Sequence, residues 1–161
     1  NPATADPETV AQEIVTSMDL TALPLSMVPK DGPGVYGLVG LPVWFWTPAN
    51  QWKEKTKSKS SGGLNVSVTA KVDRVVIRPG DGSTVTCMGP GTKYRESFGI
   101  KRSPDCGHVY EEKSGAGRKY SITATTYWKA RWTGGNQSGT IDLDFSTNAR
   151  LAIGEAQALR Q

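Results

Sequence analysis

The chain has 161 residues, and its 19 lysines and arginines against 15 aspartates and glutamates give a formal net charge of +4. This length is enough for one solid hydrophobic core, or for a small domain with an extension. The charge is too small for a chain built to neutralise many phosphates, and no apolar run is long enough to span a membrane. Composition therefore argues against nucleic acid as a partner and against a membrane span.

The first predicted element is a helix over about residues 7–18. Asp6 suits the N-cap position, Pro7 the first helical position, and Glu8 the positive end of the helix dipole. Apolar residues four positions apart form a stripe along one face of this helix. The stripe is a candidate docking surface and consists of Val10, Ile14 and Met18.

After a proline-broken extended segment, the most apolar window of the chain predicts a strand over about residues 38–47. Trp44 and Trp46 share one side of an extended segment, while Pro42 and Pro48 favour an edge strand or an irregular one. Two tryptophans on one face can stack on sugars or anchor a protein interface. The alternative is that they cover the core.

A polar, glycine-ended segment follows and is predicted to be a mobile basic loop over residues 51–63. Lysines occupy every second position of this segment, where they can contact anionic envelope polymers or an acidic partner protein. A solvated loop without a partner is the alternative. Together with the tryptophan at its start, the loop completes the candidate interaction surface with Trp52, Lys53, Lys55, Lys57 and Lys59.

Residues 64–161 are predicted to form an antiparallel β-sandwich, which makes residues 1–63 an N-terminal extension. Period-two alternation over residues 120–132, with β-branched and aromatic side chains on one face, predicts a long strand. Shorter alternating segments with turns about every ten residues are typical of a sandwich. The tail from Ala149 is ambiguous, since its composition favours helix while its apolar residues alternate around Gly154.

The stretch Pro79–Thr84, PGDGST, is a glycine loop between two of these strands. A phosphate-binding loop would have to lead into a helix N-terminus, whereas this one leads into a strand. We interpret it as a tight turn in which Gly80 and Gly82 adopt positive φ and Asp81 hydrogen-bonds the turn backbone. No nucleotide cofactor is expected.

The chain contains two cysteines, Cys87 and Cys106, which are compatible with one disulfide or with two free thiols. The charged segment between them, punctuated by glycine and proline, is long for an untethered loop in a compact domain. This favours a disulfide, which would stabilise the fold by roughly 3 kcal/mol and would place the protein outside the cytoplasm.

Other chemistry depends on very few residues. His108 is the one histidine, so any hydrolase triad would have to use it. Zinc at Cys87, Cys106 and His108 would lack a fourth ligand, and calcium at Asp142 and Asp144 would need a further carboxylate. We therefore expect no catalytic residue, no cofactor and no metal.

Three motifs between Leu64 and Trp132 resemble the PKD (polycystic kidney disease) family of Ig-like β-sandwich modules. They are PGDGST at Pro79–Thr84, CGHVY at Cys106–Tyr110 and YSITATTYW at Tyr120–Trp128. Their order and spacing are similar to that family's GDG turn, H-x-Y element and long following strand. The chain departs from the family before the turn, where IRP replaces an aromatic–Asp–Phe run and implies different packing.

More broadly, GLVGLPVWFW, SPDCGHVY and IGEAQAL look like a group of actinobacterial secreted proteins of unassigned role that contain this PKD-like core. The resemblance covers the chain from about Gly34 onward. It implies an exported or cell-surface protein, a Cys87–Cys106 bridge and a final strand in place of a helix. It also implies structural roles around the turn for Gly80, Asp81, Gly82, His108 and Tyr110.

PKD-like modules generally serve as spacers or as protein- and glycan-binding units at cell surfaces. The resemblance therefore implies a non-enzymatic secreted or surface module that binds another envelope or extracellular protein. A module that binds cell-wall glycan is the alternative, and a hydrolase using His108 is a more distant one.

Overall fold

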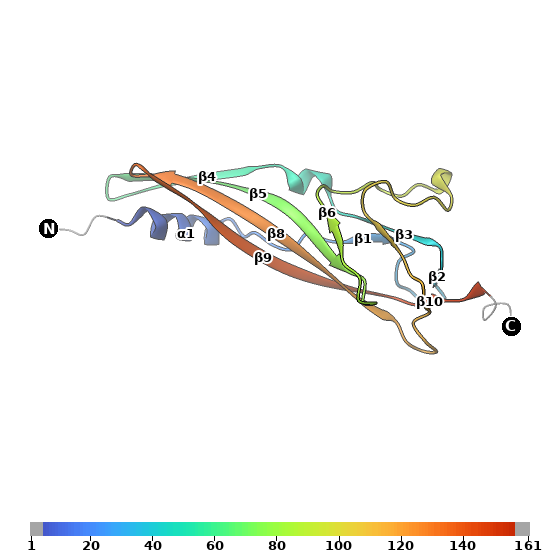
Figure 1. Ribbon diagram of the computed structural model, residues 1–161. Helices are drawn as coiled ribbons and strands as arrows, with labels where there is room; N and C mark the ends of the chain where they lie inside the picture. The colour runs from blue at the N-terminus through green and yellow to red at the C-terminus, as the bar shows by residue number, and fades with distance from the viewer. Residues whose placement is uncertain (1–4, 157–161) are drawn as a thin grey trace.

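The computed structural model describes residues 5–156 and is mainly β, with antiparallel sheets and one N-terminal helix (Figure 1). This confirms the fold class predicted from the sequence, a β-sandwich preceded by a helix. Residues 1–4 and 157–161 of the predicted segments lie outside the described residues. Within the described part, none of the helices has the length and apolar character needed to cross a membrane.

Four strands form the large sheet in the order β4 (Lys55–Ser61), β5 (Leu64–Arg78), β8 (Tyr120–Gly134) and β9 (Gln137–Leu151). Every neighbouring pair is antiparallel. The short strand β6 (Val85–Cys87) pairs with the far end of β5. Figure 1 shows these strands running together as one long, twisted sheet.

A second layer covers the inner face of this sheet. The small sheet joins β1 (Ser26–Val28), β3 (Pro42–Trp46) and β7 (Gly107–Val109), and β2 (Gly37–Leu38) pairs in parallel with β10 (Ile153–Gly154). The helix α1 (Pro7–Ser17) contacts all four strands of the large sheet. In Figure 1, α1 lies along one end of the sheet and the small sheet lies toward the other.

The helix predicted over about residues 7–18 and the long strand predicted over residues 120–132 are confirmed as α1 and β8. The Asp6 side chain caps the helix by accepting a hydrogen bond from the Thr9 N–H at 3.3 Å. The face of β8 predicted to be apolar contributes its alternate residues to the core. These residues are Ile122, Ala124, Thr126, Trp128, Ala130 and Trp132, each at most 5% exposed.

The predicted loop over residues 51–63 is wrong between Lys55 and Ser61, because this segment is strand β4. Gly62 and Gly63, both with positive φ, form the turn that pairs β4 with β5. The lysines of β4 lie beside buried residues of β5, so their side chains point toward the side of the sheet that the helix covers. Pairing with β5 makes this polar segment a strand, and its own composition carries no such signal.

Residues on the two sides of the predicted boundary at 63/64 share one sheet and one core. The β4–β5 hairpin crosses this boundary. Val10 and Ile14 of α1 belong to the same hydrophobic cluster as Val68 of the large sheet and Phe45 of the small one. The last strand of the described residues is β10, which continues the direction of β9.

Candidate functional site

The glycine turn after β5 has the predicted geometry. Gly80 and Gly82 have φ angles of 99° and 90°, a region that L-residues with side chains rarely adopt. The Asp81 carboxylate accepts a hydrogen bond from the Ser83 N–H at 3.0 Å. The prediction of a tight turn held by Asp81 is therefore confirmed.

The same turn is fastened to β7 and β8 by side chains of the CGHVY motif. His108 Nε2 lies 2.7 Å from the second oxygen of Asp81, and the Tyr110 hydroxyl donates to the Pro79 carbonyl at 2.8 Å. Tyr110 also stacks on Tyr120, with ring centroids 4.5 Å apart. His108 and Tyr110 thus act as packing and hydrogen-bonding groups around the turn, as predicted.

The ionisation of this cluster follows from its contacts. Partial burial alone would raise the pKa of Asp81, but the hydrogen bonds with His108 and Ser83 lower that pKa below its ordinary value. Burial, followed by the nearby charge of Asp81, raises the pKa of Tyr110 well above its usual range. The cluster therefore consists of a carboxylate that stays ionised and a phenol that stays protonated.

His108 also borders a cavity of about 440 Å³ lined by Arg102, Ser103 and Glu111. The Ser103 hydroxyl donates to Asp105 and accepts from the Cys106 N–H, so it is engaged within its own loop. No hydroxyl group of residues 5–156 is hydrogen-bonded to His108, whose Nε2 is taken by Asp81. The hydrolase alternative gains no support from this geometry.

Cys87 and Cys106 form a disulfide, with Cα atoms 5.5 Å apart, that ties β6 to the residue preceding β7. The disulfide removes both sulfurs as zinc ligands and as nucleophiles. In the part of the chain that the structure describes, no group of three or more His, Cys, Asp or Glu side chains is placed to hold a metal ion.

Most of the apolar residues predicted to form a docking surface lie in the core, and for these the prediction is wrong. The exposed fractions of Val10, Ile14, Trp44 and Trp52 are 3%, 1%, 4% and 9%. The helix stripe covers the large sheet, and the Trp44 ring stacks on Phe98 with centroids 5.3 Å apart. An apolar stripe serves core and interface equally well, so its periodicity does not distinguish the two.

The remaining predicted surface residues have mixed positions. Met18 and Trp46 are half-buried, and the lysines from Lys53 to Lys59 are exposed. Lys59 pairs with Glu13 of α1 at 2.8 Å, and Lys57 donates to the Ser17 carbonyl at the end of that helix at 3.4 Å. These two lysines therefore fasten the edge of the sheet to α1, which the sequence did not predict.

A different set of exposed residues forms the strongest candidate surface. We define the apolar end patch as the large apolar side chains that are exposed where the small sheet ends: Val35, Tyr36, Leu41 and Ile100, with exposed fractions of 39%, 50%, 37% and 76%. Tyr36 lines a cavity of about 470 Å³ together with Val35, and an adjoining cavity of about 170 Å³ together with Leu41 and Ile100. The two cavities thus meet at one tyrosine.

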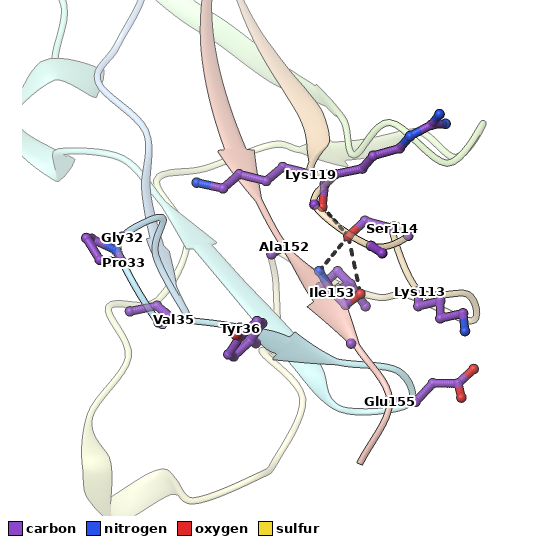
Figure 2. Close-up of a pocket in the computed structure, with 16 residues that line it drawn as sticks. Gly32, Pro33, Val35, Tyr36, Lys113, Ser114, Lys119, Ala152, Ile153 and Glu155 are labelled. Atoms are coloured by element: carbon purple, nitrogen blue, oxygen red, sulfur yellow. Dashed lines mark hydrogen bonds between the residues drawn. The ribbon is translucent and has the colours of Figure 1, made fainter. Parts of the chain in front are cut away.

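The larger cavity has walls that are tied together. Figure 2 shows Val35 and Tyr36 on one side, and Lys113, Ser114 and Ile153 on the other. Ser114 donates its backbone N–H to the Ile153 carbonyl at 2.9 Å, and its hydroxyl accepts from the Ile153 N–H at 3.0 Å. These bonds hold the loop over residues 113–119 against β10.

Charged groups around the apolar end patch are mostly basic. Lys113, Arg118 and Lys119 line the larger cavity with Glu155, and Lys101 and Arg102 follow Ile100 in the chain. Lys119 is paired with Asp31 at 2.5 Å, and its hydrogen bond lowers the pKa of that carboxyl below its ordinary value. The patch is therefore an apolar centre with a basic rim.

Sequence reasoning missed this patch because its members lie in segments that look like linkers. The available signal was local: Val35 and Tyr36 stand between glycines, and Ile100 stands in a charged loop. Apolar residues in such positions cannot be covered by their own segment. Only the fold brings the segments around residues 35–41 and 100 together.

The fold and the site define a disulfide-bonded, mainly β protein with an apolar and basic surface at one end. Comparison with known protein families, with curated proteins and with solved structures gives no match to the chain. The likeness to PKD-like modules stays a prediction based on the three motifs.

Proposed function

We propose that the protein is a non-enzymatic extracytoplasmic module that binds another extracellular or cell-envelope protein through the apolar end patch. The observation that carries this proposal is the gathering of exposed Val35, Tyr36, Leu41 and Ile100 around two adjoining cavities. Contiguous exposed apolar side chains with a polar rim are typical of protein interaction sites. Tyrosine in such a position is also a frequent energetic anchor.

The basic rim narrows the chemistry of the partner. Lys113 and Arg118 lie at the larger cavity, and the chain carries a formal net charge of +4. A partner with an apolar side chain at the centre of its interface and acidic groups around it would match this surface. Charge complementarity of this kind mainly accelerates association and rejects other basic proteins.

Two arguments support the proposed extracytoplasmic location. The Cys87–Cys106 disulfide is of a kind that persists in oxidising compartments and is rare in the cytosol. The resemblance to PKD-like modules of secreted proteins points to the same location.

The test is a capture experiment from culture medium and envelope extracts, with the partner identified by mass spectrometry. Wild-type protein is compared with Tyr36→Asp and Ile100→Asp, and with Met88→Asp as the matched control. Met88 is 68% exposed and apolar but does not line the two cavities. We expect the two patch variants to lose the partner and Met88→Asp to retain it; equal capture by all three would contradict the proposal.

A glycan ligand is the second candidate, favoured by the half-exposed Tyr36 ring on the wall of a cavity that also contains Lys113 and Glu155. An aromatic face beside polar groups can stack on a sugar ring. Retention on insoluble cell-wall polysaccharide distinguishes this candidate. Retention that is lost in Tyr36→Ala and kept in Tyr36→Phe would replace the protein partner with a glycan.

A further inference from the structure

Among the described residues, the strand β9 is an edge of the large sheet and pairs along its length with β8 alone. Just beyond it, the carbonyls of Ala152 and Gly154 accept hydrogen bonds from Gly37 and Val39 at 2.8 and 2.9 Å, on the side away from β8. Residues two apart in a strand direct their backbone groups to the same side. The even-numbered residues from 138 to 150 therefore present N–H and C=O groups along the outer edge, where residues 5–156 supply no backbone partner.

This edge lacks the features that usually prevent pairing with another chain. Lysine, proline and bulges protect exposed sheet edges, and β9 contains no lysine, no proline and no register shift against β8. The opposite edge, β4, carries Lys55, Lys57 and Lys59. On the inner side of β9, Ile141, Leu143 and Phe145 are only half-buried. An added strand would cover both these side chains and the free backbone groups.

The charged side chains on the outer face of β9 are complementary to those of a second copy of the same strand. This face carries Asp142, Asp144 and Arg150, because an even number of positions separates each of them from the next and side chains alternate between the two faces of a strand. If a second copy pairs antiparallel with its Ser146 opposite Ser146, Asp142 lies opposite the partner's Arg150, twice by symmetry, and Asp144 lies opposite the partner's Asn148. On the inner face, Phe145 then lies opposite the partner's Thr147.

Two observations favour this register over others. Beyond Arg150 the outer edge is already occupied by β2, so pairing has to end there. Centring the pair on Asp144 would place that carboxylate opposite the partner's Asp144, which is unfavourable. At the end of this segment, a groove of about 690 Å³ lies between Asn148, Ala149 and Arg150 of β9 and the residues of β1.

We propose that two copies of this chain pair through β9, antiparallel about Ser146, and join their large sheets into one. The surface used is distinct from the apolar end patch, so self-association goes beyond the proposed binding of another protein. A dimer would present two copies of the apolar end patch and gain avidity for a multivalent partner.

The first test is a charge exchange measured by sedimentation velocity of the full chain over a range of concentrations. The wild type is expected to dimerise. Asp142→Arg places Arg opposite Arg, and Arg150→Asp places Asp opposite Asp, so each variant alone should dimerise about tenfold or more weakly. An equimolar mixture should restore a heterodimer, because the two variants carry opposite charges at facing positions. A mixture that stays monomeric would overturn the register.

The second test removes a backbone donor. Ser146→Pro deletes an outward N–H at the centre of the pair and leaves the hydrogen bonds to β8 intact. Thr140→Pro is the matched control, since Thr140 is also an outward-facing even position but lies outside the paired segment. We expect Ser146→Pro to be monomeric and Thr140→Pro to remain dimeric, both with wild-type secondary structure by circular dichroism.

Each remaining outcome decides the proposal. A wild type that is monomeric at every concentration overturns self-pairing, and so does a dimer that survives Ser146→Pro. If the wild type is monomeric and a different protein is captured by it and lost in Ser146→Pro, the edge accepts a foreign strand and the second copy is ruled out as its occupant. Tyr36→Asp should dimerise normally, which separates failure of this proposal from failure of the apolar end patch as a binding site.

Discussion

At the scale of single residues, Asp81 links the glycine turn to the rest of the sandwich. One carboxylate oxygen accepts the Ser83 N–H, and the other contacts His108 of β7. Asp81 and His108 have side chains that are only 19% and 13% exposed. A charged hydrogen bond that is shielded in this way contributes more than one at the open surface.

The first prediction concerns the pH dependence of this contact. The pKa of Asp81 is lowered from its ordinary value of 3.8, so its contribution to stability is present above that value. The contribution is lost as the pH falls through the lower folded-state pKa. We expect Asp81→Asn to lower the melting temperature by a few degrees at neutral pH, as a loss of about 1 kcal/mol does in a domain of this size. The difference from wild type should disappear in strong acid.

Thermal melts over a pH series measure this effect, with Glu54→Gln as a control at an exposed carboxylate outside β9. A difference between Asp81→Asn and wild type that persists unchanged into strong acid would mean that the ionised carboxylate is not the stabilising group.

The second prediction compares the two glycines of the turn. A methyl group on Gly80 would lie 2.5 Å from the Ser121 carbonyl oxygen, whereas one on Gly82 would meet nothing within 4 Å. Both positions have positive φ, so each substitution carries a backbone cost of about 1–2 kcal/mol. Gly80→Ala should lose clearly more than Gly82→Ala because β8 also has to shift. Urea denaturation measures the difference, and equal losses would argue against close approach of the turn to β8.

At the scale of elements, β6 and β7 depend on each other through the disulfide. Each has only three residues, and the loop between them has little regular structure apart from the short 3-10 helix η2 (Glu96–Phe98). The disulfide joins the ends of this loop, which restricts the unfolded chain.

The third prediction is that the double variant Cys87→Ala/Cys106→Ala loses about 3 kcal/mol of unfolding free energy. The loop over residues 88–105 should also become more sensitive to proteolysis in the folded state. Chemical denaturation and limited proteolysis with mass analysis measure the two effects. Unchanged stability of the wild type in reducing agent would contradict the prediction.

At the scale of the whole molecule, α1 and the two sheets share one hydrophobic cluster. Ile14 of α1 is 1% exposed, and the helix contacts every strand of the large sheet. Removing the helix would expose the inner face of that sheet, so residues 64–161 should not fold without residues 1–63.

The fourth prediction follows from this shared core. Ile14→Ala should lower the unfolding free energy by about 2–5 kcal/mol, while Gln12→Ala on the exposed face of α1 should change it by less than about 0.5 kcal/mol. Far-ultraviolet circular dichroism and tryptophan fluorescence should report one coincident transition. Two separate transitions would indicate that the helix and the sandwich unfold independently.

The sequence by itself determined the elements whose signals are local. The Asp6 cap, the alternating faces of β8 and the positive-φ glycines at 80 and 82 follow from the preferences of a few neighbouring residues, and all are found in the structure. Similar local reasoning favours the disulfide, because the segment between the two cysteines is poorly suited to pack by itself. These features need no information from distant parts of the chain.

Only the tertiary structure decided which apolar residues are covered and which edges stay open. Trp44 and Ile14 carry patterns that fit an interface, yet both are buried. Ile14 covers the large sheet, and Trp44 packs under Tyr94 and Phe98 of the loop between β6 and β7. The lysine-rich segment at 55–61 is a strand because β5 lies beside it. Tyr36 and Ile100 meet at one surface although their segments are far apart, since burial and strand pairing depend on contacts that no local pattern records.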